Sequence, residues 1–246
     1  LHPRVRRQRQ MCIRDRIVKI AMALVTSLGT VMMPRIANLF KQNQLEQVRA
    51  HLLKSFRFVF FLSFPMMFGL MAVSCNLVPW FFGSGYDKVV PNMMVISPIL
   101  VIIALSNIMG TQYLLPIGRQ KEYTFSVVVG CVVNFSMNIL LIPHFLSIGA
   151  AIATVIAESS VTGVQIYCIR KDFDFGHIMK ENIHYVISAF FMFVLTSFLA
   201  KFLRPSIIST FLCVVVGASI YLGILAIMKD DMFFQGKKML GSRFIK

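Results

Sequence analysis

The chain is organised around residues 131–158, which read CVVNFSMNILLIPHFLSIGAAIATVIAE. Two apolar runs meet there at a short polar break, Pro143-His144, and neither run carries a charge before Glu158. With their flanks, the runs have the roughly 20 apolar residues that an α-helix needs to cross a bilayer. The stretch therefore predicts two membrane helices joined by a tight turn.

Polar side chains recur along one face of each predicted helix. In the first helix, Asn134 and Asn138 are four residues apart and so share a face. In the second helix, the polar positions are Thr154, Glu158, Thr162 and Gln165. A neighbouring row of small residues, Gly149, Ala153 and Ala157, lets another helix approach closely in lipid. Membrane helices with inward-facing polar stripes indicate part of a transport path.

The composition also favours a membrane protein. Of the 246 residues 57% are apolar, and the mean hydropathy is +0.74, whereas soluble domains have about 45–50% apolar residues. A net charge of +15 is also typical of nucleic-acid-binding proteins. Here the basic residues lie between apolar blocks, which is the pattern of positive loops beside membrane spans. We therefore expect membrane lipids, and no nucleic acid, among the partners.

The five cysteines are scattered and form no C-x-x-C pair or Cys/His cluster with metal-ligand spacing. We interpret them as small core residues and predict neither a disulfide nor a metal site. The 16 methionines and 23 phenylalanines are interpreted as lipid-facing and packing residues, so no cofactor is expected.

Seven segments have the length and apolarity of a membrane helix. They are residues 20–40, 58–80, 91–115, 123–142, 147–169, 182–200 and 205–228. The connections are short and contain turn residues, and no segment has the composition of a soluble domain. The predicted fold class is all-α, a polytopic transmembrane bundle of about seven spans.

Lysine and arginine are distributed unequally between alternate connections. The connections after the first, third and fifth spans and the C-terminal tail hold 15 of them, and the alternate connections hold 3. Because cytoplasmic loops carry the excess of positive charge, we expect these connections and the C-terminus to be cytoplasmic. The first predicted span then begins outside.

Residues 1–16 differ from the rest of the chain, with six arginines against a single acid, Asp15. We interpret them as a non-native segment joined to a truncated gene product, with a genuine polybasic arm as the alternative. We also expect at least one further span upstream, because this basic segment would otherwise lie outside. The remainder divides into a five-span bundle, residues 17–170, and a C-terminal hairpin with its tail, residues 171–246.

Three motifs carry a resemblance to a known family. They are LGTVMMPRI at residues 28–36, NIMGTQYLLPIGRQKEY at 107–123, and NILLIP at 138–143 followed by GAAIAT at 149–154 and Glu158. These segments resemble bacterial polysaccharide flippases of the multidrug/oligosaccharidyl-lipid/polysaccharide exporter superfamily. The resemblance runs from about residue 17 to residue 170, and beyond it only the hydropathy agrees.

The resemblance implies a fold and a function. Such flippases have fourteen spans in two six-helix lobes and a final pair, so the seven spans here correspond to the second lobe of a MATE-like exporter fold plus a final hairpin. It implies a bacterial cytoplasmic membrane transporter, not an enzyme, that moves a polyprenyl-diphosphate-linked oligosaccharide between leaflets. The partner that this implies, besides the lipid-linked oligosaccharide, is the missing N-terminal lobe.

Glu158 is the only acidic residue well inside a predicted span. An ionised group near the bilayer centre costs about 2.5–3.5 kcal/mol on insertion scales, so it must be protonated, paired or facing water. One hypothesis is a coupling site for H⁺ or Na⁺. The alternative is a packing role, in which the carboxyl bonds with Asn134 or Asn138.

Other polar residues are candidates for the substrate or ion pathway. The resemblance implies that Arg35 contacts the diphosphate of the lipid carrier, and snorkelling to the interface is the alternative. Asn107, Gln112, Asn134 and Asn138 can both donate to and accept from sugar hydroxyls, although hydrogen bonds between helices are equally expected. Thr154 belongs to the same polar stripe as Glu158.

Three other functions remain open at this point. An ion-coupled multidrug antiporter of the same superfamily is less favoured, because drug exporters usually end after twelve spans. A membrane-embedded polysaccharide polymerase would need a sizeable outer loop with acid and base residues, and the predicted outer connections offer only Asp87 and His144. The third is that the chain has no activity without its first lobe.

Overall fold

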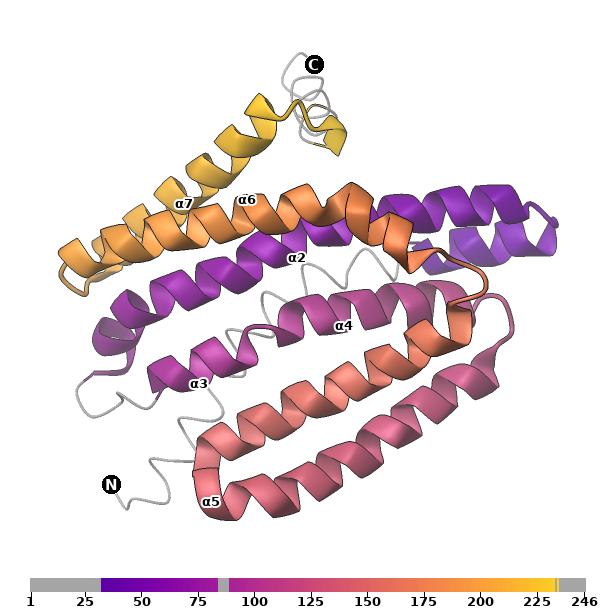
Figure 1. Ribbon diagram of the computed structural model, residues 1–246, viewed down its shortest axis with the longest axis horizontal. Helices are drawn as coiled ribbons and strands as arrows, with labels where there is room; N and C mark the ends of the chain where they lie inside the picture. Colours follow the sequence, from indigo (N-terminus) through magenta and orange to yellow (C-terminus); the bar gives the residue numbers. More distant parts are fainter. Residues whose placement is uncertain (1–31, 84–88, 233, 235–246) are drawn as a thin grey trace.

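The computed structural model describes residues 32–83, 89–232 and 234, and every regular element in these ranges is helical (Figure 1). A helical stretch over residues 32–41 is followed by α2 (Leu45–Phe82), α3 (Val89–Ile96), α4 (Ile99–Asn107), the π-helix η1 (Ile108–Leu114), α5 (Gln120–Ile169), α6 (Phe175–Phe202) and α7 (Ile207–Ile227). Counting α3 to η1 as one, five of these stretches are long and apolar enough to cross a membrane.

α2 is longer than a bilayer is thick. Its 38 residues rise about 57 Å at 1.5 Å per residue, whereas the hydrocarbon core is only about 30 Å thick. The first third of α2 carries most of its charges, so this part extends beyond the apolar span. After a turn at Asn43, where φ is 56°, it packs back against residues 32–41 through Ile36, Val48 and Leu52.

The next crossing is built from three helical pieces. α3 and α4 are separated at Ser97 and Pro98, because proline has no N–H to continue the helix. After Asn107 the backbone widens into the seven-residue π-helix η1, and the Leu115 N–H donates to the Gly110 carbonyl five residues earlier, at 3.0 Å. π-Helical segments are rare in proteins, and those that occur are often found at functional sites.

α5 is a helical hairpin of 50 residues. The helix is interrupted at Leu146, where φ is 53° and ψ is −122°, three residues after Pro143. Its first arm (residues 120–145) and second arm (residues 147–169) run antiparallel, as Figure 1 shows. These arms are the two helices that the sequence predicts on either side of Pro143-His144.

α6 and α7 form a second antiparallel pair with side-chain caps at both starts. The Asp174 carboxylate accepts from the His177 N–H at the start of α6, and Ser206 and Ser209 form a capping box at the start of α7. α6 lies along α2, and α7 packs against both. The Tyr221 hydroxyl of α7 donates to the Phe61 carbonyl of α2 at 2.8 Å.

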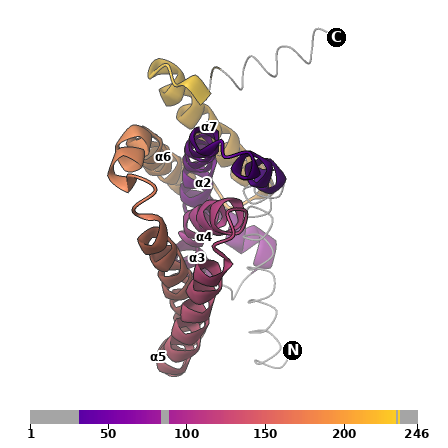
Figure 2. The same ribbon diagram turned by 90° about the vertical axis from the view of Figure 1, so that its right-hand side faces the viewer.

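The helices are arranged with α2, α3 and α4 in the middle of the molecule. Figures 1 and 2 both show the α5 hairpin on one side of them and α6 with α7 on the other. α5 packs mainly against α3, α4 and η1, and α6 packs mainly against α2 and α7. Large apolar side chains remain exposed along α5, α6 and α7, as expected where lipid is the solvent.

The connections alternate between two ends of the bundle (Figure 1). Residues 41–44, 115–119 and 170–174 lie at one end, which we call the basic end because this half of the bundle carries most of the lysines and arginines outside the apolar spans. Residues 228–232, which end α7, lie against α6 at His184 and Tyr185. The end of α2, the start of α3, the α6–α7 connection and the turn of α5 lie at the other end. The charge asymmetry found in the sequence therefore coincides with the two ends of one bundle.

The predicted all-α fold is confirmed, and six of the seven predicted spans correspond to α2, α3 to η1, the two arms of α5, α6 and α7. The first predicted span falls mostly, and the segment 1–16 entirely, outside the described residues. The interpretation of the cysteines as core residues is wrong for Cys75 and Cys131, which are exposed. Both lie on apolar helices, Cys75 in α2 and Cys131 in the first arm of α5.

Candidate functional site

A groove of about 720 Å³ runs along the first arm of α5. One wall is formed by side chains from Tyr123 to Pro143 on this arm, and the other by residues 157–165 of the second arm, with Ser106 of α4 at its floor. Most of the lining is apolar, and the polar exceptions are Ser106, Tyr123, Asn134, Asn138, Glu158 and Gln165. The groove is therefore an apolar channel along a membrane-length hairpin, with a few polar side chains set into its walls.

Two glycines allow the arms of α5 to come close enough to form this groove. A Cβ on Gly149 would lie 2.4 Å from the Leu141 carbonyl oxygen, and a Cβ on Gly130 would lie 2.3 Å from the Val161 side chain. Real Cβ atoms do not approach that closely, so larger residues at these positions would separate the arms. The small row predicted at Gly149, Ala153 and Ala157 is buried, as close approach requires.

Three of the predicted pathway residues meet in the groove. Asn134 and Asn138 line it from the first arm and Glu158 lines it from the second. The Asn138 amide donates to the Asn134 side-chain oxygen at 2.8 Å. Within the described part of the chain the half-buried Glu158 carboxylate has no hydrogen bond or ion pair, so the bond to Asn134 or Asn138 expected for a packing role is not observed.

The rest of the polar stripe on the second arm has structural partners. Thr154 donates to the Ala150 carbonyl of its own helix at 2.8 Å, and Thr162 donates to the Ile102 carbonyl of α4 at 3.2 Å. The Gln165 amide donates to Ser126 of the first arm at 3.2 Å. The members of the stripe therefore differ: Thr154, Thr162 and Gln165 form hydrogen bonds with helices, whereas Glu158 faces the groove without one among the described residues.

The remaining candidates lie outside the groove. Gln112 is buried and donates to the Asn107 side chain at 3.3 Å, so these two amides pair along η1. Arg35 is exposed in the helical stretch 32–41 at the basic end. The residues that sequence reasoning missed are Ser106, Tyr123 and Cys131. One helical face of the first arm carries Asn134 and Asn138 together with Tyr123 and Cys131. Extending the asparagine stripe along the helix would therefore have identified Tyr123 and Cys131 as lining residues.

A cluster of charged side chains closes the basic end of α5. Arg119, in the connection before α5, donates to Glu122 at 2.8 Å from Nε and to Asp172 at 2.6 Å from one terminal nitrogen. The other terminal nitrogen donates to the Cys168 carbonyl at 2.9 Å. Its hydrogen bonds to Glu122, and further to Asp172, raise the pKa of Arg119 above its ordinary value. The guanidinium therefore stays charged and joins both arms.

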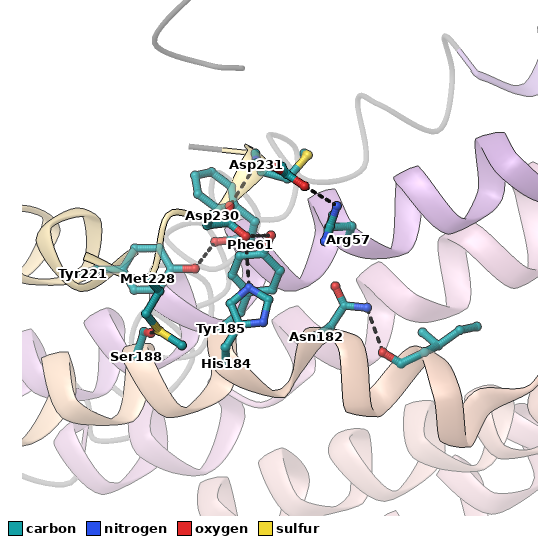
Figure 3. A network of polar contacts seen from close by, with 12 residues as sticks. Arg57, Phe61, Asn182, His184, Tyr185, Ser188, Tyr221, Met228, Asp230 and Asp231 are labelled. Atoms are coloured by element: carbon teal, nitrogen blue, oxygen red, sulfur yellow. Dashed lines mark hydrogen bonds and ion pairs between the residues drawn. The ribbon is translucent and has the colours of Figure 1, made fainter. Parts of the chain in front are cut away.

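A second polar network joins α2, α6 and the end of α7 (Figure 3). Asp230 is buried, and one of its carboxylate oxygens accepts from the Tyr185 hydroxyl at 2.7 Å and contacts His184 Nε2 at 3.0 Å. Its other oxygen accepts from the Met232 N–H at 2.9 Å. The network fixes the end of α7 against α6, and it lies far along the chain from the groove residues.

Among residues 32–83, 89–232 and 234, no three His, Cys, Asp or Glu side chains are grouped as for a bound metal. The groove offers one carboxylate and the side-chain oxygens of three amides, Asn134, Asn138 and Gln165, and such oxygens are ligands suited to a hard cation such as Na⁺. The same amides can donate to and accept from hydroxyl groups. Its chemistry is that of binding rather than covalent catalysis.

Five helical stretches of membrane length and apolarity define the chain as a multi-pass membrane protein. The profile of the family described as "Lipid II flippase MurJ" matches residues 12–218, so this chain belongs to the MurJ flippase family. This confirms the resemblance to flippases that the motifs indicate. The family is one of transporters, which also confirms that the chain is not an enzyme.

Several relatives share the sequence over part of their length. An uncharacterized membrane protein of Methanocaldococcus jannaschii is 26% identical over 205 residues, covering 83% of this chain and 40% of the relative. The "Putative O-antigen transporter" of Escherichia coli K12 is 32% identical over 90 residues, which cover 37% of this chain and 22% of the relative. "Lipid II flippase MurJ" of Bacillus subtilis is 24% identical over 143 residues, which cover 57% of this chain and 26% of the relative.

A solved structure shares the fold. "Lipid II flippase MurJ, inward closed conformation" superposes with a TM-score of 0.75 at 18% identity, over 89% of this chain and 46% of that protein. The likeness confirms the helical architecture predicted from the sequence. The chain spans less than half the length of each of these relatives.

Proposed function

We propose that this chain forms one lobe of a flippase that moves a polyprenyl-diphosphate-linked oligosaccharide from the inner to the outer leaflet of the bacterial cytoplasmic membrane. The observation that carries the proposal is the groove of α5, where Asn134, Asn138 and Glu158 face one space. Relatives named as a lipid II flippase and an O-antigen transporter support this substrate class. Flipping needs no covalent chemistry, only a polar path through the bilayer.

Each part of such a substrate has a matching surface on the chain. Sugar hydroxyls would exchange their hydration for the two groove asparagines, which both donate and accept. The polyprenyl chain would stay in lipid beside the apolar rim of the groove, for example at Phe135 and Ile139. Arg35 is proposed to meet the diphosphate at the basic end, because a guanidinium binds phosphate in a bidentate manner.

Glu158 is proposed as the site that couples transport to H⁺ or Na⁺. A carboxylate at this depth is costly unless it is protonated, paired or in contact with water, and it has no partner within the described residues. A bound cation or proton would remove that cost. Thr154, one turn away, is a further candidate ligand once its hydroxyl turns from the Ala150 carbonyl.

The orientation follows from the charge pattern. Because positive loops remain in the cytoplasm, the basic end and the C-terminus are proposed to face the cytoplasm. A transport path between two lobes also needs a second lobe, which we propose faces the groove. The support is that the superposed MurJ structure is about twice as long as this chain.

A second candidate is an ion-coupled antiporter for lipophilic cations. It is favoured by one observation, that the groove is mostly apolar and holds a single carboxylate, Glu158. Such a site suits a cationic aromatic compound better than a sugar chain. The two functions differ in what the asparagines do, since a lipophilic cation has no need of them.

The test measures flipping in membrane vesicles that contain the chain together with a first lobe from a full-length relative. A fluorescent polyprenyl-diphosphate oligosaccharide is loaded in one leaflet, and its arrival in the other is followed by quenching. We expect flipping above that of vesicles without the chain, and its loss in the variant with Asn134→Leu and Asn138→Leu. Ser136→Ala, an exposed change on the same arm, is the matched control.

The outcomes separate the candidates. Flipping that is equal in the double asparagine variant and in the control contradicts the role of the groove. Transport of a lipophilic cation without flipping of the oligosaccharide favours the antiporter. The absence of both activities at normal membrane levels of the chain contradicts the proposed function.

A further inference from the structure

The groove ends abruptly toward the basic end of the bundle. Its last lining residue there is Tyr123 on the first arm and Gln165 on the second. Arg119 binds the side chain of Glu122, which precedes Tyr123, and the carbonyl of Cys168, which lies three residues after Gln165. A single guanidinium therefore joins the two arms just beyond the last residues that line the groove.

Arg119 also ties the arms to the connection that leads to α6. It donates to Asp172, 53 residues away in sequence, at 2.6 Å. The next residue, Phe173, is buried between Phe56 of α2 and Tyr113 of η1, with ring centroids 6.3 and 5.1 Å away. Since α5 packs mainly against α3, α4 and η1, this point links the hairpin to the α2–α6 side of the bundle.

The element that leads into Arg119 departs from regular α-helical geometry. η1 is a π-helix, in which each turn holds one residue more than in an α-helix, and such segments mark functional sites. Its Gly110 lies against Tyr123 and Gln165, where a Cβ would come within 2.7 Å of the Tyr123 ring and 3.0 Å of the Gln165 amide. The Gln112 side-chain oxygen in η1 is buried without a hydrogen bond, so this conformation leaves a cost that another can relieve.

The bonds of Arg119 with Glu122 and Asp172 are of moderate strength, as expected for a contact that can break and form again. Arg119, Glu122 and Asp172 have side chains that are 29%, 36% and 34% exposed. Charge-assisted bonds of this geometry are among the stronger side-chain contacts, but partial exposure to water limits what they contribute. The cluster can therefore favour one arrangement of the arms without locking it.

We propose that Arg119 is a positioning residue that latches the two arms of α5 and keeps the groove closed toward the basic end. Release of Asp172 and of the Cys168 carbonyl lets the first arm and η1 move away from the second arm, which opens the space around Glu158 to that end. The proposal rests on the proposed function, because it assigns a regulatory step to the same groove. Arg119 does not touch the substrate in this role.

The test uses Cys131 as a reporter, because this exposed cysteine lines the groove. The other four cysteines are replaced by alanine in the full chain. A charged, membrane-impermeant thiol reagent is then added to sealed vesicles from the side of the basic end, and the rate of Cys131 labelling is measured. No transported substrate is needed, so the result is independent of the flipping assay.

We expect Arg119→Gln to increase the labelling rate on the order of tenfold, the population shift that loss of such a bias produces. Lys121→Gln is the matched control, since it removes the same charge from an exposed side chain two residues away. The exchange variant with Arg119→Asp and Asp172→Arg rebuilds the ion pair with its polarity reversed. We expect it to restore slow labelling, which a general loosening of the fold would not predict.

If Arg119→Gln fails to accumulate in the membrane, Asp172→Asn and Glu122→Gln each remove one carboxylate from the latch and serve in its place. Equal labelling rates in these variants and in Lys121→Gln overturn the proposal. Faster labelling that the exchange variant does not reverse also overturns it, because the effect would then not come from the ion pair. A latch that behaves as expected while flipping is absent would refute the proposed function alone.

Discussion

Tyr221→Phe removes a hydroxyl that completes the backbone hydrogen bonding of another helix. In α2, Pro65 has no N–H to donate to the Phe61 carbonyl four residues earlier. The Tyr221 hydroxyl of α7 donates to this carbonyl instead, at 2.8 Å, and the tyrosine is 3% exposed. Hydrogen bonds between membrane helices contribute about 0.6 kcal/mol on average and up to about 1.7. Because the variant leaves a buried carbonyl unpaired, we expect a loss of about 1 kcal/mol.

The reasoning is tested by a double-mutant cycle with Pro65→Ala, measured as the free energy of reversible unfolding in mixed micelles. In the Pro65→Ala background the backbone N–H at position 65 donates to the Phe61 carbonyl, so Tyr221→Phe should cost close to nothing. Tyr167→Phe is the control, because Tyr167 is exposed and no hydrogen bond of its hydroxyl occurs within the described residues. An equal cost of Tyr221→Phe in both backgrounds would refute the reasoning.

Three further predictions concern the groove and the topology. Glu158→Gln should abolish transport at an unchanged membrane level of the chain, and transport by the parent chain should vary with external pH if the coupled ion is H⁺. Survival of transport in this variant would reassign Glu158 to packing. Gly149→Ala should destabilise the hairpin by about 1–3 kcal/mol, because its Cβ meets the backbone at Leu141. Gly163→Ala, where nothing lies within 4 Å, should be neutral or stabilising in the same unfolding assay. A reporter enzyme that works only in the cytoplasm should be active when it is fused at Lys246, and one that works only outside the membrane should be inactive there. Activity of the external reporter would contradict the span assignment.

The elements of this fold were predictable from the sequence because lipid imposes a length on each apolar segment. The break at Pro143-His144 predicts the α5 hairpin, and the spacing of Asn134 and Asn138 predicts that they share a face. The approach of Glu158 to that face also follows, since the two arms are adjacent in sequence and joined by a tight turn. Local sequence is sufficient wherever the contact is between neighbours along the chain.

Features that depend on distant partners were not predictable in this way. Asp230 follows the last span in a polar tail, and nothing in the local pattern shows that it is buried against Tyr185. From the sequence alone, Arg119 is one more positive residue in a loop. Its contact with Asp172, 53 positions later, is visible only in the fold. The π-helix η1 escapes prediction for another reason, because its register differs from that of an α-helix while its residues have no distinctive propensity.

The contacts between distant helices share one chemical feature that hydropathy does not report. Lipid tails are as apolar as a helix surface, so apolar burial alone cannot tell one helix which neighbour to choose. Among the described residues three side chains cross between elements to bind a backbone carbonyl: Tyr221 to Phe61, Thr162 to Ile102, and Arg119 to Cys168. Each bond favours one partner and one register, because sliding or exchanging the helix would break it. In a bilayer, a polar side chain that bonds across to another helix therefore specifies a neighbour, whereas Glu158, a carboxylate in a span without a partner among the described residues, is one to examine for transport.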